Sequence, residues 1–183
     1  YKLLDNFNDL WEIADKFNSE AIIEISHTDQ SNADWGFWGS GADEGNSVNV
    51  MVGPRGYSKP SGSDAPDYAS GWSFDATIAD IKALKDAGKA DYSPGYKDTG
   101  YFLKKFMPLN SDASTGGGAT VLNYKQNVYA IRLADTYLME AEALGGSGTR
   151  AQALLDAVRA RVGLPSIPVS TIAILAERRL ELA

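Results

Sequence analysis

The chain has 183 residues, a formal net charge of −7 and no cysteine. The acidic balance disfavours a nucleic-acid-binding protein, because phosphate backbones are bound by clusters of lysine and arginine, and the absence of cysteine excludes disulfides, CxxC redox pairs and thiolate metal sites within these residues. The apolar fraction of 44% is ordinary for one globular domain with a hydrophobic core, and no apolar run approaches the roughly 18 residues of a membrane-spanning helix.

The first 27 residues are predicted to form a helix followed by a strand. Helical spacing of apolar side chains predicts the helix over residues 5–18, with Asp5 as a plausible N-cap. Trp11 lies on its apolar stripe and is expected in the core. The β-branched residues between 21 and 25 predict a short strand.

Residues 28–127 show little periodicity and are rich in Gly, Ser, Asn, Asp and Pro, with aromatic residues among them. Disordered segments are poor in aromatic residues, so we expect ordered loops that face a ligand. A short helix is predicted over 78–87, with Thr77 as N-cap, Asp80 completing a capping box and Gly88 ending it. A short extended piece is predicted near 101–103.

From residue 128 onward the pattern is helical. An apolar stripe from Ala130 to Leu144 predicts a first helix, which ends at two glycines. A capping box at Thr149 begins a second helix that ends at Gly163, and a third begins at Ser170 or Thr171. The first two helices span the length of about one tetratricopeptide (TPR) repeat, and Tyr137 is expected in its core.

Neither end of the chain has the features expected of a natural terminus. The first residues lack a signal peptide, and the last residues lie inside a helical pattern without a cap. TPR-like stacks need about three or more repeats. We therefore expect the chain to be an internal-to-C-terminal piece of a longer protein, with further helical pairs outside it.

Three C-terminal motifs resemble those of the SusD/RagB family of nutrient-binding outer-membrane lipoproteins. Residues 130–144 are similar to the family's "RLAE-x-YL-x-x-AEA" helix, residues 158–165 to "VR-x-RAGLP", and residues 177–183 to "ERR-x-ELA". Weaker similarities lie at 18–23, 71–72 and 100–106. The order and spacing of the three strong motifs make the resemblance specific.

The resemblance implies a mostly α fold of TPR-like helical pairs, a SusD-like α-α superhelix with long irregular loops and a few short strands. It implies one SusD-like domain over 1–183, divided into a helix and strand (1–27), a loop-rich ligand region (28–127) and a TPR-like helical region (128–183).

The same resemblance implies a location on the extracellular face of the outer membrane of Bacteroidetes, through a lipid anchor outside these residues. The implied function is to hold glycans, without catalysis or cofactor, for a SusC-like TonB-dependent β-barrel transporter. Two alternatives stay open: a peptide-binding SusD/RagB-like protein, and a TPR-like interaction scaffold that binds no sugar.

The candidate ligand-binding residues are aromatic: Trp35, Trp38, Tyr57 and Trp72. Sugar rings have apolar C–H faces that stack on indole and phenol rings, and the Gly/Asn/Asp-rich surroundings supply partners for hydroxyl groups. The alternative is that these rings bury apolar area and fix the loops to the core.

Catalysis and metal binding have weak support. Glu177 and Glu181 share a helix face, but nearby arginines favour interhelical ion pairs over a glycosidase pair. A lone His27 cannot build a histidine-rich zinc site. The acidic loop from Asp29 to Asp34 departs from the EF-hand pattern, because Ala33 occupies the fifth, ligand position and no glycine occupies the sixth.

Overall fold

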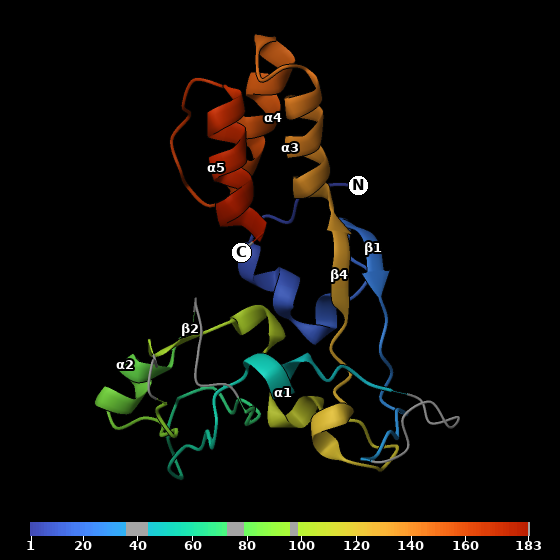
Figure 1. The fold of residues 1–183 in the computed structure, drawn as a ribbon, viewed down its shortest axis with the longest axis vertical. Helices are drawn as coiled ribbons and strands as arrows, with labels where there is room; N and C mark the ends of the chain where they lie inside the picture. The colour runs from blue at the N-terminus through green and yellow to red at the C-terminus, as the bar shows by residue number, and fades with distance from the viewer. Residues whose placement is uncertain (36–43, 73–78, 96–98, 183) are drawn as a thin grey trace. The chain divides into compact units, whose positions relative to one another are not determined.

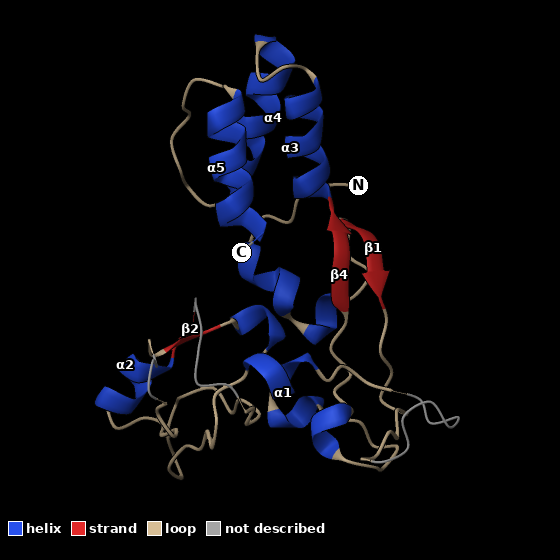
Figure 2. Cartoon of the chain, viewed as in Figure 1, coloured by secondary structure: helices blue, strands red, loops and turns tan. Residues whose placement is uncertain are grey.

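The computed structural model describes residues 1–35, 44–72, 79–95 and 99–182. The chain divides into two compact units, which we call the helical unit (residues 1–25 and 128–183) and the loop unit (residues 26–127). The loop-rich region predicted at 28–127 falls within the loop unit. The single-domain organisation stays a prediction. The elements of both units are shown in Figure 1 and, coloured by type, in Figure 2.

The helical unit is built on helices α3 (Leu133–Ala143), α4 (Gly148–Arg161) and α5 (Thr171–Leu182), which pack against one another. They lie side by side in Figure 1. Small side chains at the helix contacts, such as Ala134, Ala141 and Ala151, are fully buried and allow the helices to approach closely. The rest of the core is aliphatic: Leu138, Leu154, Leu155, Val158 and Ile174.

The predicted ends of these helices are mostly confirmed. Gly145 and Gly146 follow α3 with φ of 75° and 62°, the left-handed backbone that glycine tolerates best. The Ser170 hydroxyl accepts a hydrogen bond from the Ala173 amide at the start of α5. The predicted capping box at Thr149 is wrong, because α4 begins at Gly148 after Ser147 and has no side-chain cap.

The predicted start of the first C-terminal helix is also wrong. Residues Val128–Arg132 form strand β4, which pairs antiparallel with the predicted strand β1 (Ala21–Ile25). Val128 faces Ile25 across the ladder and Ile131 faces Ile23. Cross-strand pairing of β-branched residues therefore outweighs the helical periodicity that continues into α3.

The helix predicted over 5–18 is replaced by two short 3₁₀ helices, Phe7–Trp11 and Ile13–Asp15. Glu12 separates them with an extended backbone, at φ −89° and ψ 135°. Trp11 is half-buried and packs edge-on against Phe7 and Tyr129, with ring centroids 5.8 and 5.9 Å away. The expected packing role of Trp11 is retained although the helix is not.

The loop unit contains helices α1 (Val48–Val52) and α2 (Ile81–Asp86), strands β2 (Ala79–Asp80) and β3 (Tyr101–Phe102), and short 3₁₀ turns at Lys104–Phe106, Asn110–Asp112 and Thr120–Leu122. Strands β2 and β3 pair antiparallel, so the extended piece predicted near 101–103 is confirmed. Helix α2 is shorter than predicted. Its N-cap is Asp80, which accepts from the Ala83 amide at 2.8 Å, and Thr77 lies outside the described residues.

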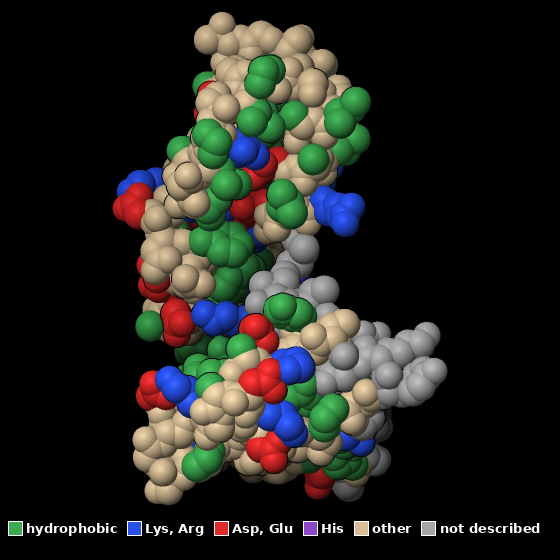
Figure 3. Space-filling view, turned by 90° about the vertical axis from the view of Figure 1, so that its left-hand side faces the viewer, with side chains coloured by type: hydrophobic (Ala, Val, Ile, Leu, Met, Phe, Trp, Pro, Cys, Tyr) green, Lys and Arg blue, Asp and Glu red, His purple; other side chains and the backbone are tan. Residues whose placement is uncertain are grey.

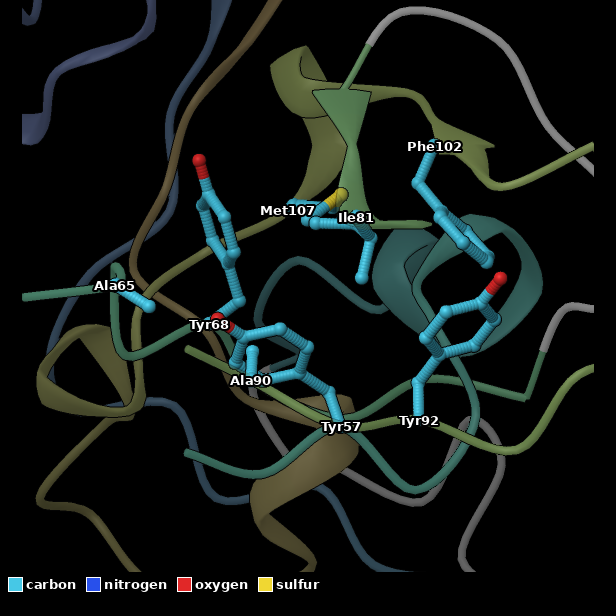
Figure 4. Packing of buried hydrophobic residues seen from close by; sticks show 8 residues of the cluster. All are labelled: Tyr57, Ala65, Tyr68, Ile81, Ala90, Tyr92, Phe102 and Met107. Atoms are coloured by element: carbon cyan, nitrogen blue, oxygen red, sulfur yellow. The ribbon is translucent and has the colours of Figure 1, made fainter. Parts of the chain in front are cut away.

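The core of the loop unit is largely aromatic, as Figure 4 shows. Tyr57 and Tyr68 meet edge-on with ring centroids 5.7 Å apart, and Tyr92 and Phe102 meet edge-on at 5.5 Å. Large aromatic side chains bury much apolar area per residue. They let a segment with little regular structure enclose a core.

The regular structure of the described residues is mainly helical with few strands, in agreement with the predicted fold class. Within the described residues, no helix has the length and apolarity required to cross a bilayer.

Candidate functional site: an exposed tryptophan pair

Two of the predicted ligand residues meet on the surface of the loop unit. The indoles of Trp35 and Trp72 stack with ring centroids 5.4 Å apart and planes inclined by only 10°. This is the offset parallel arrangement that aromatic rings favour. Trp35 is 44% exposed and Trp72 is 50% exposed. About half of each tryptophan in this stacked pair is therefore open to solvent.

Trp72 is fixed through its main chain. Its amide donates to the Val50 carbonyl of α1 at 3.0 Å, and its carbonyl accepts from the Arg55 guanidinium at 2.7 Å. Its indole is not needed for either bond. A change of this side chain should thus leave the backbone of the site in place.

The residue before Trp72 must be small. A Cβ on Gly71 would lie 2.3 Å from the Asn49 carbonyl oxygen and 2.5 Å from the Gly53 Cα. The Gly71 amide donates to the Pro54 carbonyl at 2.8 Å, in a bridge between two extended segments. Only glycine allows this approach, which sets the direction in which the chain enters Trp72.

The segment that leads to Trp35 is held at Ala33 by a buried asparagine. The Asn123 side-chain oxygen accepts from the Ala33 amide at 2.9 Å, and its amide nitrogen donates to the Ala33 carbonyl at 2.7 Å. Asn123 is 1% exposed. The Trp35 amide itself donates to the Asp34 carboxylate at 2.8 Å. Asn123 was not predicted, since no local pattern links it to a residue so far along the chain.

Tyr57 lies in the core of the loop unit and not at the tryptophan pair. It is 7% exposed, and its hydroxyl donates to the Pro66 carbonyl at 2.6 Å. Burial raises the pKa of Tyr57 to about 12, with smaller contributions from Tyr68 and Asp67. The structure thus gives Tyr57 a packing role (Figure 4) in place of the ligand contact expected from the sequence.

Trp38, the fourth predicted ligand residue, lies outside the described residues. His27 follows β1, and its amide donates to the Asn127 side-chain oxygen at 2.8 Å. Among the residues that the structure describes, no group of three or more His, Asp or Glu side chains could hold a metal ion. The acidic loop at Asp29–Asp34 lies within these described residues.

The carboxylates considered for catalysis are engaged in ion pairs inside the helical unit. Arg132 and Arg161 both donate to Glu181, at 2.6 and 2.5 Å, and both donate to Glu20, at 3.1 and 2.6 Å. These four side chains, which we call the buried ion network, are at most 6% exposed. Burial opposes the charge of Arg161, but its hydrogen bonds to Glu181 and Glu20 hold its pKa above the ordinary value.

Glu177 has a similar structural role. It accepts from Arg159 at 2.5 Å, and Arg159 also donates to the Pro165 carbonyl at 2.9 Å. The prediction of interhelical ion pairs for Glu177 and Glu181 is confirmed. Each carboxylate is matched by a buried guanidinium, and this arrangement ties the helices together.

Comparisons with known proteins agree with the predicted family. The family model of the SusD family matches residues 76–183. A solved laminarin-binding SusD-like protein is 61% identical with a TM-score of 0.91, and the match covers 100% of this chain and 43% of that chain. No curated protein sequence matches the chain.

Two further solved structures are of surface glycan-binding protein A from Bacteroides thetaiotaomicron. The first is 26% identical with a TM-score of 0.84, covering 99% of this chain and 43% of that chain. The second, in complex with laminarihexaose, is 26% identical with a TM-score of 0.82, covering 99% and 44%. The chain thus spans less than half the length of these relatives, and none of the three is named as an enzyme. With the family match and the 61% identity together, the chain belongs to the SusD family.

Proposed function

We propose that the chain is part of a cell-surface protein that binds laminarin-type glucans, whose backbone is β-1,3-linked glucose, without cleaving them. The observation that carries the proposal is the stacked pair of half-exposed indoles, Trp35 and Trp72. The relative that is 61% identical is named for laminarin binding, which supports this choice of glycan.

The pair suits the chemistry of a glucose ring. The C–H face of a pyranose is apolar and flat, and it can stack on an exposed indole while the hydroxyl groups at its edge stay in polar contact. The Asp34 carboxylate and the Arg55 guanidinium bond to the main chain of the two tryptophans. Both groups thus lie near the tryptophan pair, where they could form hydrogen bonds with the hydroxyl groups of a bound sugar.

The absence of bond cleavage is part of the proposal. A glycosidase needs two carboxylates on either side of the scissile bond, one of which is able to donate a proton. Glu177 and Glu181 are buried, and each is engaged in an ion pair with an arginine of α4. They are poor candidates for a general acid.

Three finer features go with membership of this family. We propose that α3 and α4, which pack through small residues, form one TPR-like pair. We also propose that the full-length protein is lipid-anchored to the outer membrane. Its proposed partner is a SusC-like TonB-dependent transporter, to which it delivers the glycan.

The test is calorimetric binding of laminarihexaose to the full-length protein and to its Trp72→Ala and Trp35→Ala variants. Because Trp72 bonds through its main chain, Trp72→Ala should fold normally and weaken binding by about 10- to 100-fold, the cost of losing a central aromatic contact. Cellohexaose, maltohexaose and a peptide panel test the linkage and the class of ligand.

The matched control is Tyr101→Ala, which removes an aromatic ring of similar exposure (47%) from the same unit. It should bind laminarihexaose as the unaltered protein does. Equal binding by all variants, or a loss confined to Tyr101→Ala, would move the site away from the tryptophan pair. Preference for a peptide would overturn the glycan assignment, and release of shorter sugars on long incubation would overturn the absence of cleavage.

A further inference from the structure

Met51 is the most exposed large apolar side chain in the described part of the loop unit, at 75%. The two residues before it in α1 face inward, since Asn49 and Val50 are 1% and 7% exposed. A single exposed apolar residue is ordinary on a protein surface and needs no explanation. What distinguishes Met51 is its place beside the tryptophan pair.

The main chain holds Met51 next to Trp72. The Trp72 amide donates to the Val50 carbonyl at 3.0 Å, and the peptide bond places the nitrogen of Met51 about 2.3 Å from that carbonyl oxygen. The two main-chain nitrogen atoms are therefore at most about 5.3 Å apart. A second hydrogen bond fixes the same contact, because the Asn49 side chain donates to the Ser70 carbonyl at 3.2 Å. The side chains of Met51 and Trp72 thus leave neighbouring main-chain positions, and both are open to solvent.

Exposed apolar side chains are concentrated at this place rather than spread over the loop unit. Among the described residues of the unit, three of the four large ones are the tryptophan pair and Met51, and the fourth is Tyr101 on β3. On the side of the loop unit where α2 lies, Figure 3 shows lysine or arginine side chains interspersed with aspartate or glutamate. Helix α2 carries ion pairs such as Lys82 with Asp86. A gathering of apolar groups on a surface that is otherwise polar and charged favours a ligand with apolar faces.

Methionine complements the two indoles in shape. An indole is flat and rigid, whereas the thioether chain of methionine is flexible, polarizable and able to follow a surface that is not flat. A β-1,3 linkage turns each glucose ring relative to the one before it, so successive rings of such a glucan do not share a plane. A flat indole can stack on one ring, and a flexible side chain beside it can follow the tilt of the next.

We propose that Met51 is a third contact residue of the glycan site, and that it packs against the glucose unit next to the one stacked on the tryptophan pair. This inference rests on the proposed function, because it requires the glucan to lie on Trp72. It adds a flexible aliphatic residue to a set of candidates that, from the sequence, were all aromatic.

The first test measures whether bound glycan covers Met51 in the full-length protein. In dilute hydrogen peroxide the sulfur lone pair attacks one peroxide oxygen and the O–O bond breaks, so that one oxygen stays on the sulfur as a sulfoxide and the other leaves as water. Peptide mass spectrometry gives the oxidation rate at each methionine. Saturating laminarihexaose should slow the oxidation of Met51 at least about 3-fold and leave the rate at Met139 on α3, which is 38% exposed, unchanged. Calorimetry on the same sample separates the two proposals: bound glycan without protection of Met51 overturns this inference alone, whereas no binding overturns the proposed function and this inference with it.

The second test compares two replacements of Met51. Met51→Leu keeps an apolar side chain of similar volume, whereas Met51→Gln keeps the length and adds a polar amide. Met51→Gln should weaken laminarihexaose binding by about 3- to 10-fold, and Met51→Leu should stay within about twofold of the unaltered protein. Met139→Gln, the matched control, should bind normally, and neither replacement of Met51 should shift the midpoint of thermal unfolding, because Met51 is mostly exposed. Equal binding by the two Met51 variants, with binding by Trp72→Ala still weakened, overturns the role of Met51 and leaves the tryptophan site in place.

Discussion

The helical unit and the loop unit bury polar groups of different kinds. The helical unit buries charged pairs between elements, such as Arg132 with Glu181. The loop unit buries neutral side chains: Ser31, Asn46, Asn49, Asn123, Gln126 and Asn127. Helices satisfy their own main-chain groups, whereas loops must find other partners for theirs. Buried amides such as Asn123 therefore replace secondary structure in the unit that carries the tryptophan pair.

The largest expected effect is on the buried ion network of the helical unit. Arg132→Met removes one of the two guanidinium groups that face Glu20 and Glu181, and leaves the carboxylates under-compensated in a buried site. Breaking a buried pair in this way costs about 3–5 kcal/mol. Denaturant unfolding of the full-length protein measures the loss of stability. Hydrogen exchange then shows whether this loss occurs in the helical unit.

Arg150→Met is the control for this prediction. Arg150 pairs with Glu140 on the surface, at 63% and 44% side-chain exposure. Exposed pairs contribute little to stability, because water and salt screen the two charges. Similar losses for Arg132→Met and Arg150→Met would show that the network contributes no more than a surface pair.

The next largest effect is expected at Asn123 in the loop unit. Asn123→Ala removes both side-chain bonds to Ala33 and a third to the Ala119 carbonyl, so buried main-chain groups lose their partners. We expect a loss of about 2–4 kcal/mol in the free energy of unfolding. Because Ala33 leads directly to Trp35, laminarihexaose binding should weaken too, as calorimetry at a temperature where the variant is folded would show.

Asn110→Ala provides the comparison. Asn110 is exposed and donates to the Tyr68 carbonyl over a longer distance of 3.4 Å. The Asn110→Ala substitution should reduce stability little and leave laminarihexaose binding unchanged. If the Asn123→Ala variant were less stable yet bound the glycan normally, the two hydrogen bonds to Ala33 would contribute to stability alone and would not position Trp35.

The contrast between regular helices in one unit and irregular loops in the other also explains which features could be predicted from the sequence. Periodicity identified α3, α4, α5 and β1, because regular elements repeat their pattern locally. It failed at β4, where the apolar pattern runs unbroken from strand to helix and only the pairing with β1 distinguishes them. Their aromatic side chains made Trp35 and Trp72 candidate ligand residues. Their stacking could not be predicted, because it joins segments far apart in the sequence and no local pattern indicates it. Tyr57 has similar glycine- and serine-containing surroundings, yet it is buried.

The smallest expected effect is a loss of stability at alkaline pH, to which tyrosines of both units contribute. In the loop unit burial also raises the pKa of Tyr124. Burial raises the pKa of Tyr57 in the loop unit to about 12, and burial together with Glu24 raises the pKa of Tyr129 in the helical unit to about 12. An unfolded tyrosine loses its proton near pH 10, about two units earlier. The stabilisation is thus fully present below about pH 10 and is lost as the pH rises toward 12.

At about pH 11 Tyr57 and Tyr129 should each account for a loss of about 1 kcal/mol. Tyr57→Phe and Tyr129→Phe should each make the unfolding free energy fall less steeply between about pH 10 and 12, in denaturation series at matched ionic strength. The Tyr57→Phe variant should also have a free energy of unfolding lower by about 1 kcal/mol at neutral pH, because the hydrogen bond to the Pro66 carbonyl is lost. Tyr101→Phe alters an exposed ring and serves as the control. A slope that changes for one of these two variants and not for the other would show that only that tyrosine limits alkaline stability.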